Sequence, residues 1–168
     1  MHPCTTSCHG AAACRLHVEA LLRLHGTPDD AEWVRDSLDT LLPLARAGTP
    51  HAELDRVAEL LRRRIAIDAD GSLDPSAFLR SPELPAHPVL AGALAVTAAR
   101  AEGVALGVLT HHSGRLALAH ASLPDPVVIE LTTGYPQIDV TGSEAGWRWA
   151  CAHELAALTG LGLPVASG

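Results

Sequence analysis

Apolar residues recur at helical spacing in the segment that follows Thr49-Pro50. They lie three or four positions apart on one face, whereas Arg62, Arg63 and Arg64 fall mostly on the other side. This pattern is typical of a helix with one buried face and one solvated face. The apolar positions are Leu54, Val57, Ala58, Leu61 and Ile65.

The same spacing predicts helices over residues 11–25 and 28–45, and Pro43 is expected to kink the second one. Three helices are each expected to begin at a capping residue followed by proline, because the first turn of a helix leaves its N–H groups without partners. These starts are Thr27-Pro28, Thr49-Pro50 and Asp74-Pro75. Residues 1–67 are therefore predicted to form a helical unit with short loops.

The pattern changes after residue 67. Residues 68–72 are polar and contain glycine, which predicts a loop, and a short helix with Phe78 and Leu79 follows. Small residues dominate 88–102, which predicts a buried, closely packed helix. Alternating or apolar runs predict strands over 104–110, 116–121 and 127–131, the last two forming a hairpin around 123–126, and a final helix over 144–158 with Cys151 in its buried face. The predicted fold class is α+β.

Length and composition limit the classes of function. The 168 residues suit one domain, with 1–67 as the helical unit and 68–168 as the core, and 48% hydrophobic against 18% charged residues is typical of a globular protein. A net charge of -7 argues against nucleic acid as a partner. The longest apolar stretch, 88–99, is too short to span a bilayer, and no secretory signal is visible, so no membrane partner and a cytoplasmic location with reduced thiols are expected.

The second half of the chain resembles the transglutaminase-like superfamily, and its SirB-type branch in particular. The resemblance rests on "LDPSAFLRSP", "HPVLAGALAVTAARAEGVALGVL", "SGRLALAH", "VVIELTTG" and the closing "LAALTG", which span about residues 73–160. It implies an α+β fold in which the N-terminal helical unit packs on a transglutaminase-like (papain-like) core with a small antiparallel sheet.

Active members of that superfamily carry a Cys-His-Asp triad, in which a cysteine at the start of the buried helix attacks an amide carbonyl. The resemblance places Pro88 at the cysteine position, Arg115 at the histidine position and Glu130 at the aspartate position. Proline has no nucleophile, and arginine stays protonated and is no general base. The three residues are expected to converge in one cleft, where Arg115 and Glu130 form an ion pair.

Histidines near this cleft are the candidates to replace the missing base. His111 and His112 precede Arg115 in the turn, and His87 is at the expected N-cap, where the helix dipole favours its neutral form. Surface turn and cap positions are the favoured interpretation of all three. His120 is an odd number of residues from Arg115 and is expected to face the other side of the sheet.

Cysteine and histidine are concentrated in the first seventeen residues, "MHPCTTSCHGAAACRLH". Cys4, Cys8, His9 and Cys14 offer the sulfur and nitrogen ligands that Zn²⁺ or Cu⁺ prefers, although their spacing matches no common zinc module. A frayed tail with incidental thiols is the favoured alternative, and a reactive tail thiol is a further one.

Three functions follow from these observations. The first is a non-catalytic binding or regulatory protein that takes a protein partner or a small-molecule ligand in the old cleft. The second is an acyl-transfer or amide-hydrolysis enzyme with relocated residues, drawn from Glu130, Arg115, His111 and His112. The third is a metal-binding protein that uses the N-terminal cluster. A site holding Glu130, Arg115 and a histidine together would favour the second.

Overall fold

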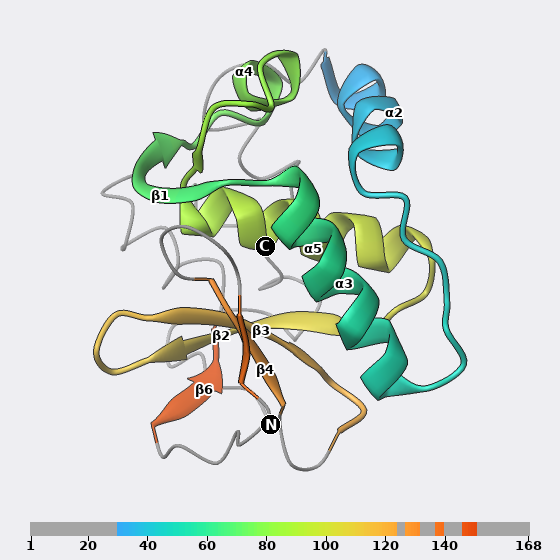
Figure 1. Ribbon diagram of the computed structural model, residues 1–168, viewed down its shortest axis with the longest axis vertical. Coiled ribbons are helices and arrows are strands. Elements are labelled where there is room, and N and C mark those ends of the chain that lie inside the picture. The colour runs from blue at the N-terminus through green and yellow to red at the C-terminus, as the bar shows by residue number, and fades with distance from the viewer. Residues whose placement is uncertain (1–29, 124–126, 132–136, 140–145, 151–168) are drawn as a thin grey trace, which may run out of the picture.

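The computed structural model describes residues 30–123, 127–131, 137–139 and 146–150 (Figure 1). This part of the chain is a mixed α+β fold, as predicted. Its helices are α2 (Ala31–Leu41), α3 (Pro50–Arg64), α4 (Pro75–Arg80) and α5 (Pro88–Ala101). Its strands are β1 (Ile67–Ser72), β2 (Leu106–His111), β3 (Leu116–His120), β4 (Val128–Glu130), β5 (Gln137–Asp139) and β6 (Trp147–Trp149).

Side-chain caps begin three of these helices, and each is followed by proline at the first helical position. The Thr49 hydroxyl accepts a hydrogen bond from Ala52 N at 3.2 Å. The Asp74 carboxylate accepts from Ser76 N at 3.0 Å. These two helix starts are confirmed, whereas Thr27-Pro28 and the helix predicted over 11–25 lie outside the described residues.

Pro43 ends a helix instead of kinking one. The second predicted helix, over 28–45, is α2, which stops at Leu41 with Leu42 as its C-cap. Proline has no N–H to continue the helical hydrogen bonds, and it also disfavours helical backbone at the residue before it. The prediction of a kinked helix to residue 45 was therefore wrong.

The sheet has five strands in the order β5-β4-β3-β2-β6, and its described pairs are all antiparallel. The three strands predicted from sequence are β2, β3 and β4, and the expected pairing of the last two is confirmed. Residues 124–126 of the predicted turn between them lie outside the described residues.

Two segments differ from the prediction. Residues 67–72 form strand β1 instead of a polar loop; Ser72 N donates to Pro85 O at 3.0 Å, and His87 N donates to Ser72 O at 2.9 Å. Residues 147–149 form edge strand β6 and not the start of a helix over 144–158. The rest of that predicted helix, with Cys151, lies outside the described residues.

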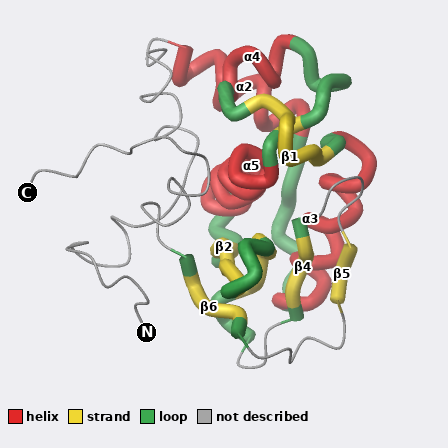
Figure 2. The backbone as a smooth tube through the Cα atoms, turned by 90° about the vertical axis from the view of Figure 1, so that its left-hand side faces the viewer, coloured by secondary structure: helices red, strands yellow, loops and turns green. Residues whose placement is uncertain are grey.

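Helix α5 is the centre of the fold. It lies between the sheet and a layer made by α2, α4 and β1, while α3 runs along one side and reaches β3 and β5 (Figures 1 and 2). All but a few of its residues are buried. A Cβ built on Gly92 would lie 3.4 Å from Leu131 Cδ1 and 3.6 Å from Val108 Cγ2, which shows how closely the helix approaches the sheet.

The alternation of side chains gives the sheet two faces. The face toward α5, called here the inner face, contributes to the main core with Leu106, Val108, Leu116, Leu118, Ile129 and Leu131. The opposite, outer face carries a second apolar cluster of Leu109, Ala117, Ala119 and Val128, against which Trp147 and Trp149 pack. Successive residues of a strand point to opposite faces, so every polar residue of the sheet can be assigned to one of them.

Candidate functional site

Polar side chains gather on the outer face where β2 turns into β3. Arg115 precedes β3, Glu130 ends β4, and Trp147 begins β6, so three strands bring them to the same corner of the sheet. We call this group the hairpin cluster. Its members are His111, His112, Ser113, Arg115, Glu130 and Trp147.

The predicted Arg115–Glu130 ion pair is present. Arg115 Nη1 lies 3.1 Å from Glu130 Oε1, and the two side chains are 36% and 18% exposed. The guanidinium also lies over the Trp147 ring, 5.2 Å from its centroid. These contacts hold the guanidinium in one orientation, with its Nε directed back at the turn.

Ser113 is at the centre of the hairpin cluster. Its hydroxyl accepts a hydrogen bond from Arg115 Nε at 3.2 Å and lies 2.7 Å from His111 Nδ1. The backbone N–H of Ser113 also donates to His111 Nδ1 at 3.2 Å, so this nitrogen is an acceptor and the hydroxyl donates its proton to it. The result is a continuous chain of hydrogen bonds from Glu130 through Arg115 and Ser113 to His111.

The two adjacent histidines differ in environment. His111 is 6% exposed, which corrects the expectation of a surface residue, whereas His112 is exposed. Their rings stack with centroids 4.0 Å apart, and Trp147 meets His111 edge-on at 5.1 Å. A Cβ on Gly146 would lie 2.9 Å from His111 Nε2, so only glycine lets the chain pass this close to the rings.

The structure does not bring Pro88 to the hairpin cluster, contrary to expectation. Pro88 begins α5, which packs on the inner face, where Leu131 contacts the helix. Glu130 and Arg115 each precede an inner-face residue by one position, so they lie on the outer face. A resemblance in sequence matches positions along a strand, but it does not fix which face of the sheet each side chain points to. The prediction that Arg115 and Glu130 converge on Pro88 was wrong for this reason.

His87 is the N-cap of α5, as predicted. Its Nδ1 accepts a hydrogen bond from Val89 N at 3.1 Å. The pKa of His87 lies below its ordinary value because the ring is desolvated by burial. The neutral form is favoured as expected, and burial is its cause.

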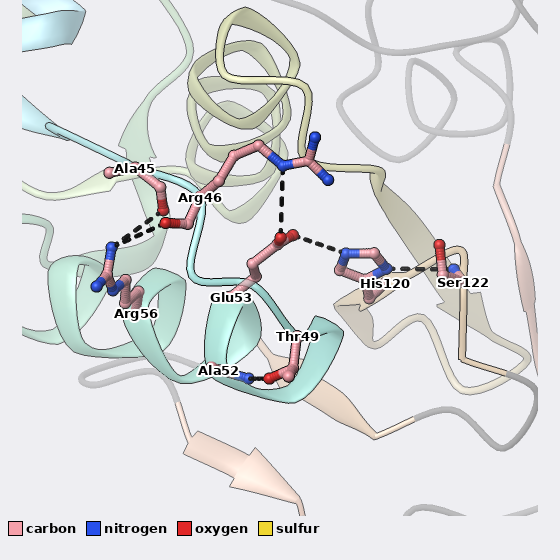
Figure 3. Close-up of polar contacts among 8 residues, drawn as sticks. All are labelled: Ala45, Arg46, Thr49, Ala52, Glu53, Arg56, His120 and Ser122. Carbon is pink, nitrogen blue, oxygen red and sulfur yellow. Dashed lines mark hydrogen bonds and ion pairs between the residues drawn. The ribbon is translucent and has the colours of Figure 1, made fainter.

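A second polar group lies on the inner face, between α3 and β3 (Figure 3). His120 Nε2 lies 2.9 Å from Glu53 Oε2, and both residues are buried, at 5% and 4% exposed. Ser122 N donates to His120 Nδ1 at 3.2 Å, so the other ring nitrogen carries the proton and donates it to the carboxylate. The exposed Arg46 adds a distant contact, with Nε 3.8 Å from Glu53 Oε1.

The placement of His120 on the opposite face from Arg115 is confirmed, but its buried partner was not predicted. Glu53 lies in the first turn of a helix, where an acidic residue is common on the surface because it suits the helix dipole. The signal missed in the sequence is that Glu53 directly precedes Leu54 in the apolar stripe. Ser113 was missed because a serine next to a glycine is a common turn residue and does not by itself indicate a functional role.

The metal candidates Cys4, Cys8, His9 and Cys14 lie outside the described residues. Within the described part of the chain, no group of three or more His, Cys, Asp or Glu side chains is placed to hold a metal ion. No described helix is long and apolar enough to cross a bilayer.

No family model, no curated protein and no solved structure matches the chain. The function must therefore be argued from the residues and their geometry.

Proposed function

We propose that this chain is a transglutaminase-like protein that binds a protein or a small molecule without using the thiol chemistry of that superfamily. Its support is the order of elements: a buried small-residue helix, α5, followed by antiparallel strands β2, β3 and β4, with the helix packed on one face of the sheet. This order agrees with the resemblance carried by residues 73–160.

The residues at the start of α5 are the observation that argues against thiol catalysis there. Pro88 occupies the first position of α5, and the neighbouring imidazole of His87 is used as a cap. The described residues include no cysteine. Among the described residues, the start of α5 therefore offers no nucleophile for thiol chemistry.

The hairpin cluster is the surface that we assign to binding. His112 and Ser113 are exposed, and Arg115 and Trp147 are partly exposed beside them, which gives a cation, a hydroxyl and aromatic rings on one small area. Arginine and tryptophan are the residues most often found to dominate the energy of protein interfaces. By contrast, the apolar crevice between α3 and α5 has no room for a water-sized molecule, whereas ordinary ligand pockets hold roughly 300 Å³ or more.

The test compares binding by the wild type with that of a doubly substituted chain, Arg115→Ala with His112→Ala. Each immobilised chain is exposed to a lysate of the source cells and to a metabolite library. We expect a bound protein or ligand to be lost with the double variant and kept with Arg63→Ala, which removes an exposed pair with Glu59 elsewhere on the surface. Blocking the cysteines with iodoacetamide is expected to leave the binding unchanged. Equal binding by all chains, or an acyl-transfer activity that iodoacetamide abolishes, would contradict the proposal.

An enzyme with relocated residues is the second candidate, because Glu130, Arg115 and His111 do lie in one hydrogen-bonded group. The metal-binding candidate is tested by elemental analysis of the purified protein. A structural thiolate site holds its metal tightly, so less than about a tenth of an equivalent of transition metal would remove that candidate.

A further inference from the structure

The geometry points to Ser113 as the nucleophile of an acyl-transfer site in the hairpin cluster, with His111 as its general base and activated esters as its substrate class. This inference rests on the proposed function for the location of the site. It adds a reaction to the binding surface, and the reaction uses an oxygen in place of the missing thiol.

The contacts of Ser113 are those that activate a hydroxyl. His111 Nδ1, at 2.7 Å, is within reach of the proton and has its lone pair directed at it. Arg115 Nε, at 3.2 Å, places a positive charge on the same oxygen, which stabilises it as it loses the proton. Ser113 itself is exposed, so an acyl group can reach the oxygen from solvent.

A second turn in the same protein shows that the turn alone does not create this arrangement. Ser122 follows His120 by two residues, and its N–H donates to His120 Nδ1 at 3.2 Å, as that of Ser113 does to His111. The structure gives a hydroxyl–imidazole contact and an arginine contact to Ser113. The two turns therefore share the backbone hydrogen bond, and Ser122 is the matched control.

The reaction is a two-step hydrolysis. Ser113 Oγ attacks the carbonyl carbon of the ester, its proton passes to His111 Nδ1, and the bond to the leaving oxygen breaks as that oxygen takes the proton. Water then attacks the acyl-serine, gives a proton to His111 Nδ1, and the serine oxygen leaves with that proton. The products are a carboxylic acid and an alcohol, and no oxidant or reductant is needed.

Esters are favoured over amides because the site offers limited help to the developing oxyanion. The N–H of Gly114, which follows the nucleophile, donates to His111 O at 2.9 Å and is already used within the turn. Arg115 remains as the positive group beside the carbonyl, held in place by Glu130. A single charged donor suits substrates with good leaving groups, whereas amide hydrolysis uses a fuller set of donors.

The experiment uses the full chain with a fluorophosphonate probe, which phosphonylates an activated serine with loss of fluoride, and peptide mass spectrometry to locate the label. Hydrolysis of p-nitrophenyl acetate is followed in parallel. We expect the label on Ser113, its loss in Ser113→Ala, and no change in Ser122→Ala. His111→Gln is expected to slow labelling about a hundredfold, within the range of general-base effects.

Glu130 acts through Arg115 and is a positioning residue. Glu130→Ala is expected to slow labelling, and Glu130→Asp to restore part of the rate, at an unchanged melting temperature for both. Labelling of Ser113→Ala at the wild-type rate, or equal loss in Ser122→Ala, would overturn the inference. If Ser113 is not labelled while binding is still lost in the Arg115→Ala, His112→Ala double variant, the reaction fails and the proposed function stands; if that binding comparison also shows no difference, the proposed function fails as well.

Discussion

The buried Glu53–His120 contact gives the sharpest stability prediction. His120→Ala leaves the Glu53 carboxylate buried, with Arg46 Nε still 3.8 Å from its other oxygen but mostly in solvent. Removing a neutral donor from a buried carboxylate costs about 1.5–3 kcal/mol, because the remaining charge keeps its desolvation cost without its hydrogen bond. We expect a loss of that size in the free energy of unfolding. A domain of this kind has a total of about 5–15 kcal/mol, so the loss is a large fraction of it.

Two controls separate the buried charge from other causes. The double substitution Glu53→Leu with His120→Phe removes the charge and its partner together and fills the space with apolar groups, so its stability is expected near the wild type. Arg63→Ala removes an ion pair whose side chains are 71% and 55% exposed, and exposed pairs contribute less than about 1 kcal/mol.

Urea unfolding followed by circular dichroism measures all four chains. The free energy extrapolated to water is compared at constant slope with respect to denaturant, because a changed slope signals a changed denatured state. A loss below about 1 kcal/mol in His120→Ala, which is the range of an exposed pair, would contradict the cost assigned to the buried carboxylate. A double substitution as unstable as the single one would also contradict it, because the loss would then not come from a carboxylate left without its donor.

Three further predictions follow from the helix starts and from β1. Burial lowers the pKa of His87, so the unfolded chain binds the proton more readily than the folded chain. The free energy of unfolding, measured by urea titration at several pH values, should therefore fall as the pH drops below about 6.5. The fall should be smaller in His87→Asn, which keeps a capping side chain. Gly71→Ala should destabilise by about 1–3 kcal/mol or prevent folding, since its Cβ would lie 2.4 Å from the Ala86 carbonyl carbon, and an unchanged thermal melt would contradict this close approach. Thr49→Ala removes the cap on Ala52 N and should cost about 1 kcal/mol, whereas Thr49→Asn should restore most of it.

Helices and strands were predicted correctly where the residues that cause them are neighbours along the chain. Thr49-Pro50 and Asp74-Pro75 begin helices because capping side chains and proline act within one turn. The small residues of 88–102 predicted a buried helix, and α5 is that helix, because side-chain size limits how closely two backbones can approach. The apolar stripe of α3 and the strand-like runs of β2 and β3 were confirmed as well.

Predictions were wrong where a segment becomes a strand only by pairing with another part of the same chain. Residues 68–72 are mostly polar, and they join a strand because the backbone of Ser72 is hydrogen-bonded to Pro85 and His87, a close approach that Gly71 permits. Residues 147–149 carry a pattern that fits either a helix or a strand, and pairing with β2 decides for the strand.

The fold class, most of the elements and the members of the hairpin cluster other than Ser113 and Trp147 could be predicted from the residues alone. The packing of the elements was needed to learn that Glu130, Arg115 and His111 face away from α5, that Ser113 joins them, and that Glu53 contacts His120, 67 positions away along the chain. The physical reason is that propensity, capping and periodicity act between neighbours along the chain. Which face of a sheet a helix covers, and which distant side chain meets a buried charge, depends on how the elements pack.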